Sequence, residues 1–224
     1  MTAPRQLVLD LPTRRALGRA DFFVSPANER ALAQVDAWPG WPGGRLAVAG
    51  PEGAGKTHLA HVWAARSGAV IVADPGVLDL ATLPGGAAVA VEDVDRLAGA
   101  REGEVALFHL CNHLAAGGGS LLVSGREPPA RWRLGLPDLA SRLEVAAVAR
   151  LEPPDDDLLA AVLVKLFADR QLAVAPEVIR WLVSRMDRSF AAAERLVAGL
   201  DRAGLAGHRP ITARLAAEVL FGDA

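Results

Sequence analysis

The sequence is poor in lysine, cysteine and long apolar runs, and each shortage excludes a class of protein. Only Lys56 and Lys165 are lysines, tyrosine is absent, and Cys111 is the single cysteine, so no internal disulfide can form. No run of about 18 apolar residues occurs, which excludes a membrane-spanning helix. The first residues lead into no signal-peptide core. We therefore expect a cytoplasmic protein without contact to a membrane.

The charge balance gives no sign of a nucleic-acid-binding surface. The formal net charge is −2 and the pI is near 6.2, which argues against a broad basic surface that grips DNA. Any contact with DNA is then local or indirect. The 224 residues, of which 51% are hydrophobic and 22% charged, are enough for a soluble protein with two layers or two domains.

One scarce lysine lies in a complete G-x-x-x-x-G-K-[ST] motif. The motif consists of Gly50, Pro51, Glu52, Gly53, Ala54, Gly55, Lys56 and Thr57. At this chain's own residue frequencies, it would arise by chance on the order of once in a thousand such sequences. An apolar run, 46–49, precedes it, and a helical pattern, 58–65, follows it. This order predicts a phosphate-binding loop in which backbone N–H groups and Lys56 hold phosphates and Thr57 holds Mg²⁺.

Short apolar runs alternate with helical patterns around this loop, which predicts an α/β domain. Expected strands are 46–49, 69–73, 87–91, 121–123 and 143–148, and expected helices include 26–38 and 104–116. After residue 152 strands cease, and helices are expected at 155–170, 176–186, 189–203 and 212–220. The predicted division is a tail at 1–20, an α/β domain at 21–152 and a small helical domain at 153–224. Acidic residues 155–157 fit helix capping better than a metal site.

Three polar residues end two of the expected strands. Glu92 and Asp93 follow the strand 87–91, a pattern that holds Mg²⁺ and orients water in phosphate-loop proteins. Asp95 is interpreted as a turn or cap residue. Ser124 ends another strand at the edge where ligands bind in such sheets, so it either contacts a phosphate or water or belongs to the following turn.

Two other segments leave alternatives open. His109 and His113 share one helix face, but no third metal ligand is evident, so a packing or surface role is favoured. In the tail, residues 6–12 alternate apolar and polar side chains up to Pro12. Such a segment either packs on its own domain or docks on a partner, for example as an added strand.

These motifs together resemble the AAA+ ATPases, in which a helical lid follows the nucleotide domain, and within them the DnaA family and its shortened Hda-type regulators. Residues 50–57 are similar to the Walker A loop, 89–93 to Walker B and 124–126 to the first sensor. The stretch 136–143 looks very like a characteristic Hda segment. The resemblance covers nearly the whole chain.

The resemblance implies roles for further residues. Arg142 corresponds to an arginine finger, Arg188 to the second sensor that contacts nucleotide phosphates, and Phe23 and Val24 to the lining of an adenine pocket. His58, directly after the loop, is included among the nucleotide-binding residues. The tail is similar to a sliding-clamp motif, and its expected contact residues are Gln6, Leu7, Leu9 and Leu11.

The implied function is negative regulation of replication initiation. A chain of this type holds ADP or ATP with Mg²⁺, docks on the DNA polymerase III sliding clamp (beta subunit), and stimulates hydrolysis of ATP bound to DnaA, meeting DNA only through the clamp. The sequence stops after the lid, where DnaA continues into a DNA-binding domain, so direct origin recognition is not expected. A homo-oligomer stays open. The alternative is a helicase-loader or clamp-loader-like replication ATPase.

One residue departs from the family pattern. The first Walker B acid is Glu92, where Asp is usual. The extra methylene moves the carboxylate by on the order of 1 Å, which can cost about a hundredfold in rate. Either Asp93 takes over Mg²⁺ or the chain's own hydrolysis is weak, so we expect an activator of the partner's ATPase more than an efficient enzyme.

Overall fold

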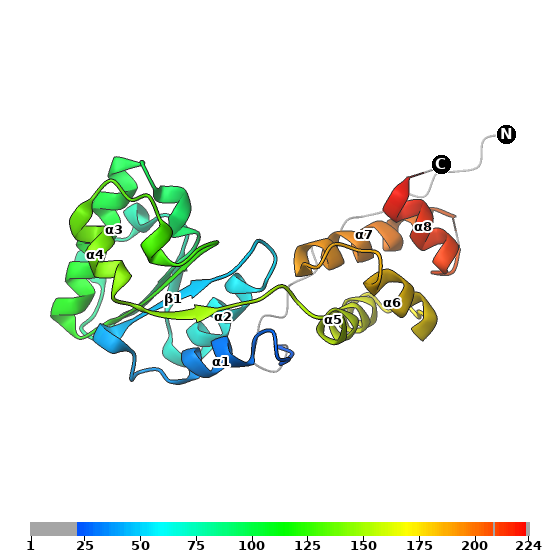
Figure 1. Ribbon diagram of the computed structural model, residues 1–224, viewed down its shortest axis with the longest axis horizontal. Coiled ribbons are helices and arrows are strands. Elements are labelled where there is room, and N and C mark those ends of the chain that lie inside the picture. Colours follow the sequence, from blue (N-terminus) through cyan, green and yellow to red (C-terminus); the bar gives the residue numbers. More distant parts are fainter. Residues whose placement is uncertain (1–21, 208, 223–224) are drawn as a thin grey trace. The chain divides into compact units, whose positions relative to one another are not determined.

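A computed structural model describes residues 22–207 and 209–222. The described chain forms two compact units, one ending at Pro153 and the other beginning at Pro154. The first unit contains a five-stranded sheet and the second consists of helices, which confirms the predicted fold class (Figure 1). Within the described ranges, no helix has both the length and the hydropathy that a membrane span requires.

All the strands of the sheet run parallel, in the order β2-β3-β4-β1-β5. The strands are β1 (Arg45–Ala49), β2 (Val70–Val72), β3 (Ala88–Val91), β4 (Ser120–Gly125) and β5 (Ala147–Arg150). The central strands are short and almost fully buried, as expected for a sheet covered on both faces.

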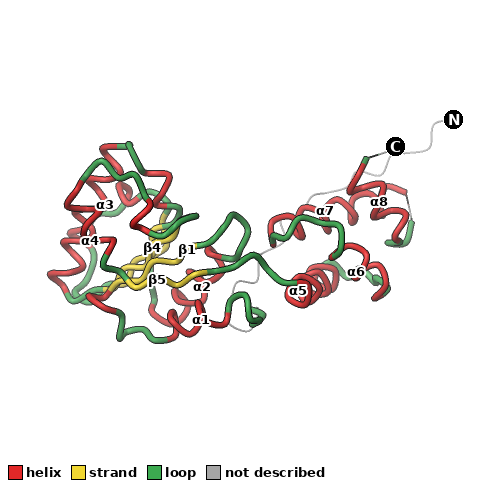
Figure 2. Tube along the Cα trace, in the orientation of Figure 1, coloured by secondary structure: helices red, strands yellow, loops and turns green. Residues whose placement is uncertain are grey.

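Helices cover both faces of this sheet. The α-helices in the described part of the first unit are α1 (Glu29–Asp36), α2 (Lys56–Ser67), α3 (Arg101–Gly117) and α4 (Pro137–Glu144). Leu46 and Val48 of β1 belong to the same apolar cluster as α1 and α2, whereas Ala47 between them belongs to the cluster of α3 and α4. This period of two is the alternation that a strand requires. Figure 2 shows the two helical layers on either side of the strands.

In the described part of the second unit, four helices pack around a core of their own. They are α5 (Asp156–Asp169), α6 (Pro176–Val183), α7 (Phe190–Gly207) and α8 (Ala213–Phe221). Leu163, Phe167 and Leu182 are almost completely buried in this core. The side chain of Asp155 accepts a hydrogen bond from the Leu158 N–H, so it caps α5, as the acidic run suggested.

The predicted strand at 143–148 is wrong in its first half. Leu143 is the last core residue of α4, and β5 begins only at Ala147. Leu139 and Leu143 are both fully buried, four residues apart, which is the helical period, and Pro137 is favoured at the start of a helix. Val145, which a buried strand would cover, is 69% exposed.

A buried carboxylate, Glu104, fixes the start of α4. Its Oε1 accepts from the N–H groups of Gly99 (2.8 Å) and Gly135 (2.9 Å), and its Oε2 accepts from that of Leu136 (2.8 Å). Burial acts to raise the pKa of this carboxyl, but the three backbone donors outweigh it and the pKa lies below its usual range. Sequence reasoning missed this residue.

Glu104→Gln should lower the free energy of unfolding near pH 7 by about 2–3 kcal/mol, because an amide cannot satisfy three converging donors. A lowered folded pKa means that the carboxylate stabilises the protein above the unfolded pKa, and that this stabilisation is lost as pH falls through the folded value. The gap between wild type and variant should therefore narrow as pH falls from about 5 to about 3. Urea denaturation at several pH values measures this difference in the free energy of unfolding. A difference that does not change with pH would contradict the lowered pKa of Glu104.

Candidate nucleotide-binding site

The loop between β1 and α2 has the backbone geometry of a phosphate-binding loop. Gly53 (φ 74°) and Gly55 (φ 98°) adopt left-handed conformations that favour glycine. At Gly50 a Cβ would lie 2.7 Å from the Leu151 carbonyl oxygen, so a larger residue does not fit there. No side chain caps α2 at its start, and the first N–H groups of a helix lack intrahelical partners. The loop therefore presents donors to an anion.

Lys56 is held against the loop itself. The side chain is buried, and its Nζ donates to the carbonyl oxygens of Gly50 (2.8 Å) and Pro51 (3.0 Å). Burial lowers the pKa of Lys56, and the nearby carboxylates of Asp93 and Asp95 oppose that shift. A buried cation at the start of a helix, whose hydrogen bonds go to neutral carbonyls, is suited to a phosphate.

The predicted acids and Ser124 meet at the carboxyl ends of β3 and β4. Ser124 is buried, and its Oγ accepts from the N–H of Asp93 (3.1 Å). Asp93 adopts a left-handed conformation (φ 51°), and its carboxylate pairs with Arg96 (3.3 Å). Glu92 has one buried carboxylate oxygen, Oε1, with no hydrogen-bond partner among the described residues.

Three residues at this edge make contacts that the sequence did not predict. The Oδ2 of Asp95 accepts from the N–H of Arg126 (3.0 Å), while its Oδ1 is buried without a partner among the described residues. Arg126 extends its guanidinium to Glu52 of the loop, with 2.6 Å between Nη2 and Oε2. One signal in the sequence could have indicated the position of Arg126 near the loop: it directly follows a buried strand, two residues beyond Ser124.

The residues present fit an Mg²⁺ ion that is held partly by a nucleotide. Mg²⁺ usually binds one or two carboxylates together with phosphate oxygens and water. Glu92 supplies an unpartnered carboxylate oxygen, and Thr57 is exposed at the start of α2. Within the described part of the chain, no group of three His, Cys, Asp or Glu side chains is placed to hold a metal ion alone.

The segment before α1 reaches the beginning of α2. Phe22 is buried, and its ring meets that of His58 edge-on at 5.1 Å. The next residues, Phe23 and Val24, are 37% and 49% exposed, and the Phe23 carbonyl accepts from the side chain of Asn28. The predicted adenine-contacting residues thus adjoin a helix whose first turn belongs to the loop motif, and they are accessible.

Arg142 lies at the other edge of the sheet. Its carbonyl oxygen accepts from Arg45, the first residue of β1 (3.2 Å), and its guanidinium lies over the ring of Phe108 on α3 (5.1 Å). The loop follows the opposite end of β1, and the strand alone spans about 13 Å. Arg142 is therefore remote from the phosphate-binding loop of its own chain.

Arg188 lies in the helical unit, in the turn between α6 and α7. Its guanidinium pairs with Asp156 (2.6 Å) and donates to the carbonyl of Pro154 (3.5 Å). It thus precedes α7, which begins at Phe190, and contacts the start of α5. Contact between Arg188 and a phosphate stays a prediction.

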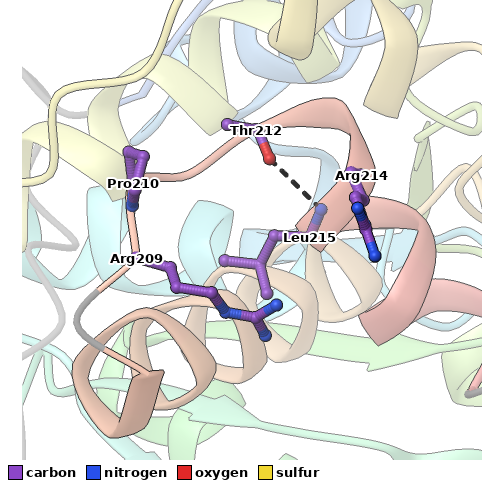
Figure 3. A pocket seen from close by; sticks show the side chains of 5 residues that line it. All are labelled: Arg209, Pro210, Thr212, Arg214 and Leu215. Atoms are coloured by element: carbon purple, nitrogen blue, oxygen red, sulfur yellow. Dashed lines mark hydrogen bonds between the residues drawn. The ribbon is translucent and has the colours of Figure 1, made fainter.

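A surface pocket of about 330 Å³ in the helical unit is a weak candidate site (Figure 3). Its lining residues are Arg209, Pro210, Thr212, Arg214 and Leu215. Both arginines pair with Glu218, at 3.0 Å and 3.3 Å, and Thr212 caps the N–H of Leu215. The two arginines of this pocket therefore share the single carboxylate of Glu218.

The remaining predictions concern Cys111, the histidines and the tail. Burial raises the pKa of Cys111 to about 11, so this thiol is unreactive. His109 is exposed and His113 half-buried on α3, in keeping with a surface or packing role. The predicted clamp-binding residues Gln6, Leu7, Leu9 and Leu11 lie outside the described residues.

Comparison with solved structures identifies the fold. No family model matches the sequence. Domain III of the replication initiation protein DnaA from Thermotoga maritima is similar at a TM-score of 0.80 and 20% identity, over 94% of this chain and 98% of that one. AMPPCP-bound DnaA from Aquifex aeolicus is similar at 0.63 and 18%, over 83% of this chain and 65% of that one.

A third similar structure is RuvB from Thermotoga maritima, a Holliday junction branch migration motor, at a TM-score of 0.61 and 17% identity over 78% of this chain and 60% of that one. The chain thus spans about two thirds of the longer DnaA and RuvB chains. At these identities the likeness concerns the fold. The parallel sheet followed by helices is the fold of the AAA+ domain in DnaA and RuvB.

Proposed function

We propose that this chain is an adenine-nucleotide-bound AAA+ regulator of replication initiation, which supplies Arg142 to ATP held by a DnaA-type partner. The observation that carries the proposal is the separation of two functional groups in one sheet. The phosphate-binding loop follows the carboxyl end of β1, whereas Arg142 is held beside its amino end. A cation in that place serves another chain's nucleotide better than its own.

Nucleotide binding has the best support. The glycine conformations, the uncapped start of α2 and the buried Lys56 suit phosphates, and the exposed Phe23 and Val24 suit a base. DnaA of the same fold binds AMPPCP. When bound, Mg²⁺ would neutralise phosphate charge, with Glu92 and Thr57 as its protein ligands. Ser124 holds the N–H of Asp93 and so fixes the turn that follows β3.

Weak hydrolysis by the chain itself agrees with the same contacts. The carboxylate of Asp93 is paired with Arg96, so this pair must open before Asp93 can activate water. Glu92 occupies the usual place of a shorter acid. The chemistry would then take place on the partner's ATP.

Arg142 would act as a finger supplied in trans. An arginine that reaches a neighbour's γ-phosphate neutralises transition-state charge, an effect of roughly 10³ to 10⁵ in rate in comparable systems. The contact with Arg45 holds the backbone of Arg142, whereas the contact with Phe108 is the one that the guanidinium gives up when the partner docks. The aromatic contact, worth about 0.5–1 kcal/mol at an exposed site, can be exchanged for a phosphate.

A replication ATPase such as a helicase loader or clamp-loader-like subunit is the second candidate. Two unpartnered carboxylate oxygens favour it, that of Asp95, whose charge acts on Lys56, and that of Glu92 directly after β3, because they suit an ATPase site within this chain. Brisk ATP turnover by the isolated protein would support this candidate.

Replacing Lys56 tests nucleotide binding. Lys56→Ala should weaken binding of ADP and AMPPCP at least about tenfold, because the buried cation is lost from the loop. Isothermal titration calorimetry measures it. Lys165→Ala, which removes the only other lysine, is the matched control, since Lys165 pairs with Asp169 on α5. Equal affinities for all three proteins would refute nucleotide binding at this loop.

Replacing Arg142 tests the finger. Arg142→Ala should lower the rate of stimulated hydrolysis of DnaA-bound ATP by a factor of about 10³ or more. The variant should still bind nucleotide at its own loop. Single-turnover hydrolysis in the presence of clamp-loaded DNA is the measurement. Arg180→Ala is the control, because this exposed arginine on α6 pairs with Glu177. Normal stimulation by the Arg142 variant would exclude the role.

The tail is proposed to dock on the sliding clamp. Changing Gln6, Leu7 and Leu11 to Ala should abolish the complex, because the apolar side chains and the amide are the expected anchors. Size-exclusion chromatography with purified clamp shows it. Unaltered co-elution of the triple variant would refute docking through these tail residues.

A further inference from the structure

Glu104 of α3 holds the segment that leads into α4, the helix that carries Arg142. We propose that Glu104 is a positioning residue for Arg142: its backbone contacts fix α4 along the helix axis and so decide where the guanidinium lies. The inference rests on the proposed role of Arg142 and deepens it. It gives a function to a buried carboxylate that lies outside the phosphate-binding loop.

The carboxylate of Glu104 joins two segments of the chain to α3. The N–H of Gly99 belongs to the segment before α3, and those of Gly135 and Leu136 are the last two before α4 begins at Pro137. Glu104 is 0% exposed. An unpaired charge at such a place is strongly unfavourable, so the donors are held against the carboxylate. The start of α4 is therefore fixed to α3.

The same face of α3 contacts Arg142. Phe108 lies four residues after Glu104, one helical turn further along. The guanidinium of Arg142 lies over its ring, 5.1 Å from the ring centroid. Burial raises the pKa of Cys111 on this helix, and the charges of Arg45 and Arg142 oppose that shift, in keeping with a guanidinium held against α3. One helix thus contacts α4 at its start and in its last turn.

The other contacts of α4 define its position along the axis less strictly. Leu139 and Leu143 are fully buried, but apolar burial is not directional, whereas hydrogen bonds weaken steeply when their geometry changes. The long side chain of Arg45, which donates to the Arg142 carbonyl, can follow a shift of the helix. Arg142 is only about 7.5 Å along the helix from Pro137, so a displaced first turn displaces Arg142 as well.

The position of Arg142 can be measured in the free protein, without nucleotide or partner. An aromatic ring shifts the NMR resonances of a guanidinium that lies over it; Phe108→Leu identifies this contribution, and Arg142→Lys assigns the Nε–H resonance. In Glu104→Gln that resonance should move at least about half of the way to its value in Phe108→Leu, because an amide cannot hold all three donors. A resonance that stays at its wild-type position would overturn the proposal.

Single-turnover hydrolysis of DnaA-bound ATP gives the functional readout. Glu104→Gln should lower the rate at saturating concentration about ten- to a hundredfold, the cost of a displacement of about 1 Å. The concentration that gives half of the maximal rate should change less than about twofold, because the proposed docking residues lie in the tail. Wild-type kinetics, or a change confined to the half-saturating concentration, would overturn the proposal.

Leu32→Ala is the control for lost stability. Leu32 is buried on α1, on the opposite face of the sheet from α3 and α4. Its truncation should lower the melting temperature, as Glu104→Gln does, but leave the stimulated rate unchanged at a temperature where both variants are folded. An equal loss of rate in Leu32→Ala would mean that Glu104 acts through stability alone, which contradicts a positioning role.

Two further variants keep the outcomes distinct. Glu104→Asp keeps the charge but is one methylene shorter, so it should fold and show both changes to a smaller extent; wild-type values for it would overturn the proposal even if Glu104→Gln does not fold. Arg142→Ala reports on the proposed function. Normal stimulation by Arg142→Ala refutes the finger, and the NMR comparison alone then decides the position. If Arg142→Ala is inactive while the Glu104 variants stimulate normally, only the positioning role fails.

Discussion

The parallel direction of the strands is the constraint on which the other features of the sheet unit depend. Because β1, β3 and β4 run the same way, their carboxyl ends meet at one edge, and the loop, the acids after β3 and Ser124 are brought together there. The same direction places the end of α4 at the other edge, just before β5 begins. One sheet thus presents a phosphate-binding loop and an arginine in opposite directions.

Electrostatic compensation is the second theme of the site. Lys56 donates hydrogen bonds to two carbonyl oxygens. Arg126 forms an ion pair with Glu52, and Asp93 forms one with Arg96. The ion pairs are exposed and therefore weak, and the carbonyls are neutral, so a nucleotide phosphate can displace them at small cost. Glu104 differs, because its three backbone contacts are buried and hold the segment that leads into α4. The contacts that a phosphate can replace lie at the edge of the sheet that carries the loop. The buried contacts of Glu104 hold the helix that carries Arg142.

The sequence predicted what depends on local pattern. The loop motif, the central strands and the fold class were predicted because glycine spacing and short apolar runs are local signals. The predicted start of the last strand was wrong. Leu143 is an apolar residue that fits either the end of a helix or the start of a strand, and the structure shows that it is buried as part of α4. Helix ends shifted by a few residues for the same reason.

The rest depends on contacts between distant segments. The approach of Arg126 to Glu52 joins residues 74 apart, and Glu104 looked like any acid in the first turn of a helix. Asp95 was assigned to a turn, and the structure adds its contact with the Arg126 backbone. The roles of Arg142 and Arg188 involve a partner or a nucleotide, which the structure does not contain. Both roles therefore stay proposals.

The central claim is that Arg142 acts on a nucleotide held by another chain. The most direct measurement is a cryo-electron microscopy structure of this protein with clamp-loaded DNA and AMPPCP-bound DnaA. The account predicts that the Arg142 guanidinium leaves the Phe108 ring and lies about 3 Å from an oxygen of the outermost phosphate of the DnaA nucleotide. A complex in which Arg142 still lies over Phe108, and no group of this chain reaches that phosphate, would contradict it.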